Sequence, residues 1–314
     1  MTMTVVPAPA ETGHSVAPPG RNRRVRQHWG ATPYLFLLPA LTLLGVFFVW
    51  PAVTAVQLAF YDYRVVSPAE FVGLGNFSHM LGDDRFYTAL TNSGLFLIGM
   101  LPILVVIPLL LAVLVNLPLR GIKVFRLVYY LPVVTSMVAV AIAWNYVYHQ
   151  RGILNWLLNT LGLLDQPVQY LLDPGWALPA LVLVESWKSL GYYMMIYLAG
   201  LQSVPRELYE AAAVDGAGPW RRLSSITVPM LRPYIAVVMV LAALDSMQVF
   251  TSVFVMTQGG PQDGTLTLGY YIYDAAFRHF NMGYASAMGL VLWAILVVFS
   301  LVSYRLTRGK AAAR

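Results

Sequence analysis

EAAAVDGAGPWRRLSSITVPMLRP, residues 210–233, is a polar, alanine-rich segment inside a chain that is 58% hydrophobic and only 11% charged. Apolar stretches at 178–201 and 235–256 flank it, and each is long enough to cross a bilayer, which takes about 20 consecutive apolar residues. The sequence therefore predicts a helix–turn–helix that is exposed at one membrane surface.

Six apolar stretches of this kind occur in the 314 residues, and the mean hydropathy of the chain is +0.65. Some contain proline, such as Pro102 and Pro132, which membrane helices tolerate because neighbouring groups satisfy the freed backbone. A soluble all-α domain would need helices with polar faces, whereas these stretches are apolar all round. The predicted spans are 33–59, 93–115, 127–147, 178–201, 235–256 and 285–306. We therefore predict an all-α membrane protein with six transmembrane helices.

The basic residues are distributed unevenly between the two sides of the predicted membrane. Fifteen of the 20 Lys and Arg residues lie in the N-terminal tail, in the loops after spans two and four, or in the C-terminal tail. Cytoplasmic loops carry the excess of Lys and Arg, so both termini are expected in the cytoplasm of a multi-pass cell-membrane protein. The net charge of +6 then orients the chain in the lipid bilayer, and we expect no nucleic-acid partner.

The predicted domain organisation is simple. Residues 1–32 read as a disordered, basic cytoplasmic tail, 33–308 as the membrane domain with a cytoplasmic loop at 203–232, and 309–314 as a C-terminal tail. The outer loops carry small folded elements, including a short helix near 85–91 and an amphipathic piece at 153–164 that Trp156 anchors at the interface. No separate catalytic domain fits.

The opening segment has features that suit a docking element for a soluble partner. A helix through 207–215 is expected to end at Gly216, a residue that readily takes the left-handed conformation. Asp215 in its last turn opposes the helix dipole, at a cost of about 0.3–1 kcal/mol. The small alanine side chains allow another chain to approach closely. The alternative is a solvated connecting loop whose alanines only favour helix.

The segment resembles the cytoplasmic EAA loop of permease subunits of binding-protein-dependent ABC importers. The family pattern is Glu-Ala-Ala, two residues, Asp-Gly-Ala, and then an Ile and a Pro further on. Leu223 stands where phenylalanine is usual, and Val228 where leucine is usual; both changes are conservative. The resemblance assigns ATPase coupling to Glu210, Ala211, Ala212, Asp215, Gly216, Ala217, Arg221, Ile226 and Pro229.

Further segments resemble the carbohydrate-uptake branch of that family, the maltose, trehalose and glycerol-phosphate type of permease. They are ESWKSLGYYM (185–194), LDSMQVFTSVFVM (244–256), TQGGPQDGTLTLGYYIYDAAF (257–277) and GYASAMG (283–289). Thr251 stands where many relatives carry aspartate. The resemblance implies the type I ABC importer permease fold and a partner permease subunit, usually a different chain. It also implies two ATP-binding subunits and an extracytoplasmic solute-binding protein.

The chain itself is predicted to be a non-catalytic subunit. No glycine-rich run followed by Lys-Ser or Lys-Thr is present, so ATP and Mg would be bound by the partner ATPase. The five histidines have no metal-ligand spacing, and the chain has no cysteine, so no cofactor or metal is expected.

Polar residues inside membrane spans are costly and mark transport pathways. Glu185 and Lys188 lie three residues apart on one helical face, and so do Asp245 and Gln248. Glu185 and Lys188 can equally form a structural ion pair. Nearby aromatic side chains, including Trp144, can pack against the C–H groups of a sugar. They can equally be ordinary packing residues or anchors at the membrane interface. The substrate-pathway candidates are Glu185, Trp187, Lys188, Tyr192, Tyr193, Asp245, Gln248 and Phe250.

The outer loop at Gly259, Gly260 and Pro261 has the composition of a plain turn, and the resemblance makes it an outer gate or a binding-protein contact. The predicted function is the transmembrane pathway of an ATP-driven importer for a disaccharide, oligosaccharide or related polyol. An ion-coupled secondary sugar transporter is the alternative, and it predicts internal repeats and broken spans. An intramembrane enzyme is a third class, but no Ser, His and Asp residues share one depth.

Overall fold

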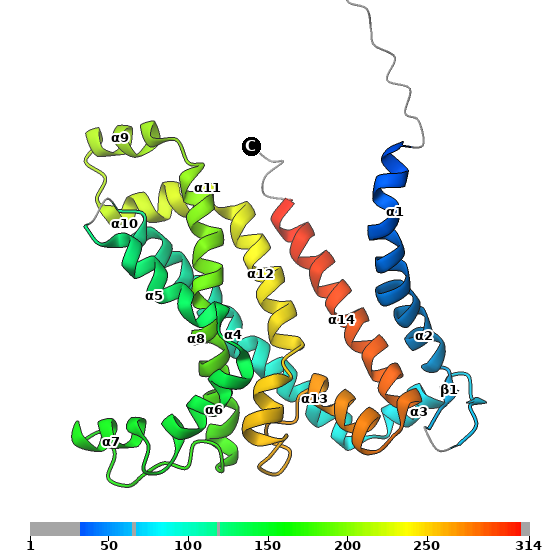
Figure 1. Cartoon of the computed structure of the whole chain (residues 1–314). Coiled ribbons are helices and arrows are strands. Elements are labelled where there is room, and N and C mark those ends of the chain that lie inside the picture. Colours follow the sequence, from blue (N-terminus) through cyan, green and yellow to red (C-terminus); the bar gives the residue numbers. More distant parts are fainter. Residues whose placement is uncertain (1–31, 65–66, 118–119, 309–314) are drawn as a thin grey trace, which may run out of the picture. The chain divides into compact units, whose positions relative to one another are not determined.

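The computed structural model describes residues 32–64, 67–117 and 120–308 (Figure 1). The chain divides into two compact units, one through Pro51 and one from Ala52 onward. The predicted tails lie outside the described residues, apart from position 32.

The first unit contains α1 (Thr32–Leu44), η1 (Gly45–Val49) and the start of α2 (Trp50–Leu58), where η marks a π-helical segment. The segment Tyr34–Leu58 is long and apolar enough to cross a membrane, and none of its most apolar window is buried within the chain. A helix with apolar side chains on all sides requires lipid or another subunit around it.

The second unit carries the remaining helices and one small hairpin. The hairpin pairs β1 (Tyr61–Asp62) with β2 (Glu70–Phe71) in antiparallel register, and α3 (Gly75–Leu81) follows it. The elements after α3 are α4 (Asp84–Val115), α5 (Ile122–Val134), α6 (Met137–Tyr148), α7 (Ile153–Thr160), α8 (Pro174–Gln202), α9 (Arg206–Val214), α10 (Pro219–Arg222), η2 (Leu223–Thr227), α11 (Val228–Met230), α12 (Arg232–Met247), η3 (Val253–Thr257), α13 (Leu268–Tyr273), η4 (Asp274–Arg278) and α14 (Met282–Arg308).

The core of this unit lies where α4 packs along α8 and where α12 packs between α4 and α14. Phe96, Met100 and Leu104, spaced four apart on α4, are fully buried there, and Tyr193 and Tyr197 of α8 are buried with them. Residues at this spacing share one helical face, which explains why each helix buries a single stripe and leaves the rest apolar and exposed.

Several spans are broken rather than straight. Among the described residues, three helices are long and apolar enough to cross a membrane alone, and two bent pairs raise the number to five. One pair joins Ile122–Val134 to Met137–Thr160 at 100°, and the other joins Pro219–Met230 to Arg232–Met247 at 72°. The predicted span 178–201 lies within the 29-residue helix α8, which is outside that set. The count of six spans therefore stays a prediction.

Within the second unit, α9 and α10 lie at one end together with the C-terminal end of α14, while α3, α7 and α13 lie at the other (Figure 1). We call these the coupling-loop end and the outer end. This separation agrees with the predicted alternation of cytoplasmic and outer loops. The separate short helix predicted near 85–91 is wrong, because α4 runs without interruption from Asp84 and the Asp83 side chain caps its first turn by accepting from the Arg85 N–H at 2.9 Å.

Candidate functional site

A polar pocket of about 360 Å³ lies within the predicted membrane region of the second unit. Five of the eight predicted pathway residues line it: Glu185 and Lys188 from α8, Asp245 from α12, and Gln248 and Phe250 just beyond the end of α12. Asp245 and Gln248 are exposed in the described chain, although they lie in a predicted span. Polar side chains at that depth face a water-filled cavity or another protein rather than lipid.

The pocket lies at a break in the predicted fifth span. Helix α12 ends at Met247, residues 248–250 are not helical, and helical structure resumes at Thr251. The break is held from the neighbouring segment: the Thr267 hydroxyl donates to the Val249 carbonyl at 3.0 Å. A Cβ added to Gly269 would lie 2.9 Å from the same carbonyl, so only glycine allows this close approach. Non-helical backbone at membrane depth is tolerated where it lines a cavity, as it does here.

Each carboxylate of the pocket accepts one short hydrogen bond from a neighbouring hydroxyl. The Ser252 hydroxyl donates to Glu185 Oε1 at 2.6 Å, and the Tyr193 hydroxyl donates to Asp245 Oδ2 at 2.5 Å. Hydrogen bonds to an ionised acceptor are the shorter and stronger class. Both carboxylates are therefore held in fixed positions between α8 and the fifth span.

Lys188 stabilises a second break, the one between α5 and α6. Its Nζ donates to the Val133 carbonyl at 3.4 Å, one residue from the end of α5. Carbonyls in the last turn of a helix lack intrahelical partners and attract cations. Among the described residues, the salt bridges do not include a Glu185–Lys188 pair, so the alternative of a direct ion pair is not what the structure contains.

The predicted aromatic residues fall into different places. Phe250 lines the pocket, and its ring stacks on Phe254 with a centroid distance of 5.4 Å. Tyr193 is buried and positions Asp245, whereas Tyr192 is 42% exposed and contacts the Tyr193 ring edge-on. Trp187 is 40% exposed and packs edge-on against Trp144 at 5.5 Å, outside the pocket.

Sequence reasoning missed part of the lining. Ser189 lies one helical turn after Glu185, so the i+4 spacing could have identified it. Thr251 attracted notice only as a departure from the family pattern. No sequence signal distinguishes the other three residues from ordinary apolar packing: Met100, Met137 and Val249.

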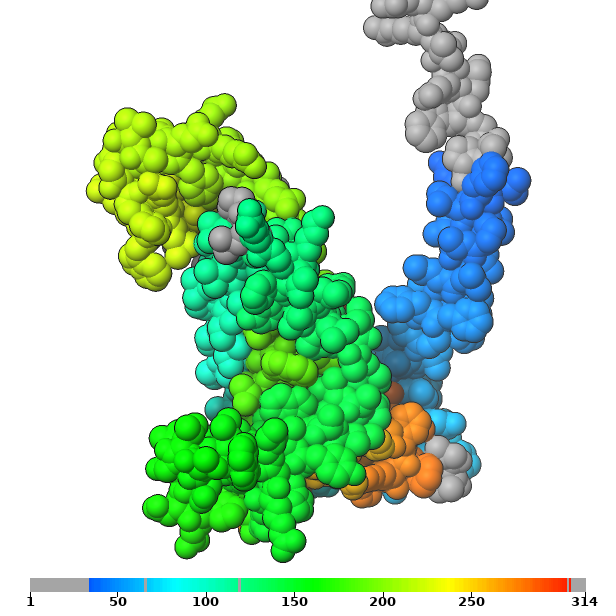
Figure 2. Space-filling model, turned by 60° about the vertical axis from the view of Figure 1, so that its left-hand side comes forward, coloured from blue at the N-terminus to red at the C-terminus, as the bar shows by residue number. Residues whose placement is uncertain are grey.

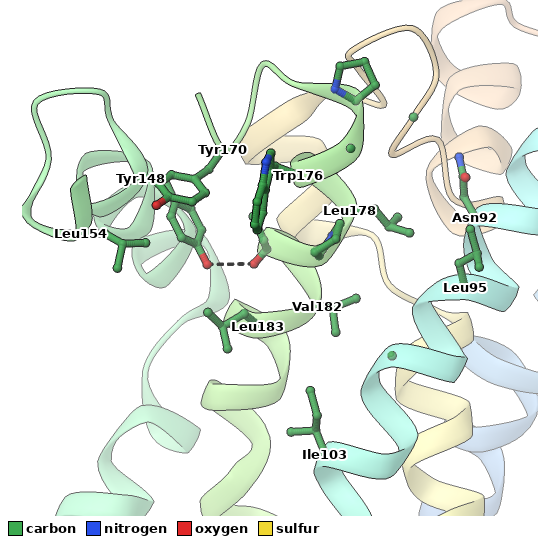
Figure 3. Close-up of a pocket in the computed structure, with 16 residues that line it drawn as sticks. Asn92, Leu95, Ile103, Tyr148, Leu154, Tyr170, Trp176, Leu178, Val182 and Leu183 are labelled. Atoms are coloured by element: carbon green, nitrogen blue, oxygen red, sulfur yellow. Dashed lines mark hydrogen bonds between the residues drawn. The ribbon is translucent and has the colours of Figure 1, made fainter. Parts of the chain in front are cut away.

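A larger cavity of about 750 Å³ lies nearer the outer end, and it is mainly apolar (Figure 3). Leu95 and Ile103 of α4 face Val182 of α8, while Leu183 lines the cavity from the other side of α8. Two of its polar side chains are already engaged. The Tyr148 hydroxyl donates to the Ala180 carbonyl at 3.0 Å, and the Asn92 amide donates to two carbonyls of the 257–267 loop, Asp263 at 2.8 Å and Leu266 at 3.1 Å. This cavity therefore offers little to a ligand rich in hydroxyl groups.

At the coupling-loop end, the EAA segment forms a short capped helix. Helix α9 ends at Val214, and Gly216 takes a left-handed φ of +72°. The N–H of Gly216 donates to the Ala213 carbonyl at 3.1 Å, and that of Ala217 donates to the Ala212 carbonyl at 2.8 Å. These two bonds are the Schellman pattern that terminates helices at glycine.

Two further bonds hold α9 to the segment that follows it. The Tyr209 hydroxyl lies 3.0 Å from Thr227 Oγ1, and Arg222 Nε donates to the Ala217 carbonyl at 2.7 Å. Ile226 and Pro229 are half-buried within this segment. The loop is therefore a folded element that keeps its own shape.

The solvent-exposed surface of this element combines large apolar side chains with charged side chains that have no partner in the described chain. Val214 is 88% exposed and Trp220 is 76% exposed. Within the described residues, the side chains of Glu210, Asp215 and Arg221 form no salt bridge or hydrogen bond. Figure 2 shows the segment as a lobe at the end of the second unit opposite to the α7 region. Exposed apolar groups rimmed by free charges mark an interaction surface.

At the outer end, the loop predicted as a gate is compact and well bonded. Gly259 is buried at φ +85°, and a Cβ there would lie 3.0 Å from the Tyr270 ring. The Thr265 hydroxyl donates to the Gly260 carbonyl at 2.6 Å, and the Gly264 N–H donates to the Pro261 carbonyl at 2.8 Å. Gly259 therefore shapes the loop, while Gly260 and Pro261 retain part of their surface.

A polar network joins the start of α4 to this loop and to the elements that follow it. Arg85 forms two hydrogen bonds with Asp263, both at 3.2 Å, and lies 3.6 Å from Asp274. Asp83 Oδ2 accepts from the hydroxyls of Tyr271 and Tyr284, both at 2.6 Å. Burial raises the pKa of the Tyr271 phenol, so this hydroxyl stays protonated and remains a donor. The network fixes the outer end across some 200 residues of sequence separation.

The electrostatics of Asp83 make the outer end sensitive to acid. Burial raises the pKa of the Asp83 carboxyl, but hydrogen bonds from Tyr271, Tyr284 and the backbone N–H groups of Arg85 and Phe86 outweigh it and leave the pKa below its ordinary value of 3.8. A carboxyl with a lowered pKa in the folded state contributes stability above its unfolded pKa and loses that contribution as the pH falls through the folded pKa.

We expect Asp83→Asn to reduce the free energy of unfolding at pH 7 by about 2 kcal/mol, since hydrogen bonds to a charged group are lost. The deficit relative to the unchanged chain should shrink as the pH falls through the folded pKa of Asp83, which lies below 3.8, because the carboxyl then becomes neutral. Thermal unfolding of the reconstituted chain between pH 7 and pH 3 measures this. Asp84→Asn, at the neighbouring exposed position, is the control and should cost less than about 1 kcal/mol. A deficit for Asp83→Asn that does not change with pH would contradict this account.

Within the described residues, no group of three or more His, Asp or Glu side chains is placed to hold a metal ion.

The comparisons with known proteins agree on one family. The sequence profile described as "Binding-protein-dependent transport system inner membrane component" matches residues 72–311. The chain is 33% identical to the lactose transport system permease protein of Rhizobium radiobacter, over 90% of this chain and 96% of the relative. It is 30% identical to the trehalose/maltose transport system permease protein of Thermococcus litoralis, over 88% and 93%.

A solved structure extends this agreement to the fold. A chain of a bacterial alginate ABC transporter, crystallised in complex with an alginate pentasaccharide-bound periplasmic protein, matches with a TM-score of 0.77 and 27% identity. The match covers 88% of this chain and 94% of that chain.

Proposed function

Because this chain belongs to the family of binding-protein-dependent transport system inner membrane components, we propose that it forms one half of the transmembrane pathway of an ATP-driven sugar importer. It is a multi-pass membrane protein with the type I ABC importer permease fold. Relatives named for lactose, for trehalose and maltose, and for alginate support a sugar or related polyol as its cargo.

The observation that carries the proposal is the polar pocket at the break in the fifth span. Asp245 and Gln248 are exposed at a depth where lipid would leave them without hydrogen-bond partners. Sugars need planar hydrogen-bonding groups for their hydroxyls and an apolar face for their C–H groups. The pocket supplies the first with Glu185, Asp245 and Gln248, and the second with the ring of Phe250.

ATP hydrolysis is expected in a separate subunit that docks on α9 and α10. The small side chains of Ala211 and Ala212 and the free charges of Glu210, Asp215 and Arg221 form the contact face. Gly216 and Ala217 close the end of α9, while Ile226 and Pro229 pack within the loop. Movement of this folded element would pass directly to α12, since α11 leads into it through a single bend at Leu231.

The remaining partners follow from the family. We expect a second, non-identical permease, two ATP-binding subunits that hold ATP and Mg, and a solute-binding protein that contacts the outer end near Gly260 and Pro261. The chain itself then performs no catalysis, and both termini lie in the cytoplasm. The broken spans that would suit an ion-coupled secondary transporter are present, but such a transporter has no use for a folded docking loop.

Reconstitution of the importer tests this function. The chain is co-expressed with the ATPase and the second permease that co-purify with it, and vesicles are loaded with ATP on the ATPase side. Labelled lactose, maltose and trehalose are offered with the binding protein. Uptake should require both ATP and binding protein, and it should stop when the phosphate-binding lysine of the ATPase is replaced. Recovery of the chain alone, active without ATP, would establish the secondary transporter instead.

A further inference from the structure

We propose that the polar pocket selects uncharged polyhydroxyl ligands over anionic ones, and that Asp245 is the residue that sets this selection. The inference rests on the proposed function and deepens it, because the names of the relatives leave the charge of the cargo open. It excludes sugar phosphates and uronates, although a glycerol-phosphate-type cargo agrees with the sequence alone.

The charge balance of the pocket is unequal. Its lining contains two carboxylates, Glu185 and Asp245, and one ammonium group, Lys188. The other polar side chains that line it, Ser189, Gln248 and Thr251, are neutral. Counted in their ordinary ionised forms, these side chains leave one net negative charge in a small cavity, where low-dielectric walls strengthen its effect on a charged ligand.

The one cation does not face the cavity freely. Lys188 Nζ donates to the Val133 carbonyl at the end of α5, where the unpartnered carbonyls carry partial negative charge. Part of its positive charge is therefore compensated before any ligand enters.

The two carboxylates differ in how much they present to the cavity. Glu185 is only partly exposed and is bound by Ser252, which is fully buried. Asp245 is exposed, and within the described residues its hydrogen bond from Tyr193 reaches only Oδ2. Oδ1 of Asp245 is thus free to accept from a sugar hydroxyl, whereas an incoming carboxylate or phosphate meets an unshielded like charge.

The chain contains no cysteine, so a single introduced thiol can report the charge of the pocket. Gln248→Cys places that thiol at the C-cap of α12, three residues after Asp245, at a side-chain separation of about 6 Å. The complete importer is reconstituted in nanodiscs without binding protein. It is treated with a cationic trimethylammonium or an anionic sulfonate methanethiosulfonate reagent, and labelling of this chain is followed by mass spectrometry. Each rate is divided by the rate of the same reagent with free 2-mercaptoethanol.

We expect the cationic reagent to react faster than the anionic one, and Asp245→Asn to lower the ratio of the two rates by about tenfold. Lys188→Met should raise the ratio. Asp62→Asn, the same substitution on β1 outside the pocket, should leave it unchanged. In 1 M salt the ratio should approach that of the free thiol, because the Debye length falls to about 3 Å.

Thr251→Cys is the second reporter, should Gln248→Cys disturb assembly. Equal rates for the two reagents, a faster anionic reagent, or a ratio that Asp245→Asn leaves unchanged would each overturn the selection. Failure of both thiols to react with either reagent would show that water does not reach the pocket, and it would overturn the pathway as well. ATP-dependent uptake of a uronate in preference to its neutral parent would remove the selection alone and leave the importer function standing.

Discussion

In vesicles that contain the importer with Gly216→Pro, ATP-driven sugar uptake is expected to fall on the order of a hundredfold, because a mismatched proline costs about 3 kcal/mol. Gly216 has a φ of +72°, whereas proline fixes φ near −65°. Proline also removes the N–H that donates to the Ala213 carbonyl at the end of α9. The docking face then loses its shape, although the spans and the polar pocket are untouched.

A series of substitutions distinguishes loss of the left-handed turn at Gly216 from the effect of any substitution in this loop. Gly216→Ala keeps the N–H and pays only for the left-handed backbone, about 1 kcal/mol, so a several-fold loss is expected. Gly218→Ala is the matched control, since Gly218 has an ordinary φ of −69° and open space around it. Uptake and co-purification of the ATPase are both measured. Full uptake by the Gly216→Pro chain with the ATPase still bound would show that α9 is not the docking element.

Gly191→Ala is expected to lower the free energy of unfolding by about 3 kcal/mol and to abolish sugar uptake. A Cβ at this position of α8 would lie 2.1 Å from the Tyr129 carbonyl oxygen and 3.0 Å from Tyr130 Cα. Both are backbone atoms of α5, so no side-chain rotation relieves the clash and α5 must move away from α8. That movement carries the Val133 carbonyl away from Lys188, which lines the pocket.

Thermal unfolding of the purified complex and uptake in vesicles measure these two effects. Gly94→Ala on α4 is the control, because nothing lies within 4 Å of the added Cβ and alanine favours the helix. Wild-type stability in the Gly191→Ala chain would mean that α5 and α8 are not in close backbone contact in the assembled importer.

The sequence predicted the local structure of the 203–232 loop more completely than the pocket, for a physical reason. Gly216 and the alanines act locally, so helix propensity and capping mark α9 in the sequence, and the residue that holds it, Thr227, follows within the same loop. The break at 248–250 contains neither glycine nor proline. It depends on Thr267 and Gly269, which contact it from a later segment. No pattern within the span itself predicts these contacts.

Helical spacing also decided which pathway candidates came together. Glu185 and Lys188 share a face with Ser189, and Asp245 shares one with Gln248, so these residues meet in one pocket. Trp187 follows Glu185 by two positions and therefore points to another face of α8, where it contacts Trp144. The network around Asp83 joins residues 188 and 201 positions apart, and a single sequence gives no sign of such pairs.

The two short bonds to the carboxylates have a mechanical consequence. Tyr193 of α8 binds Asp245 just before the break in the fifth span, and Glu185 of α8 is bound by Ser252 just after it. The break is thus hydrogen-bonded to α8 on both sides, and these bonds restrict bending at this point. We therefore expect the two halves of the fifth span to move together with α8, so that the walls of the pocket keep their spacing. Under the proposed function, recognition of the cargo would then be the same whichever side of the membrane the pocket faces, and release would depend on access rather than on reshaping the binding groups.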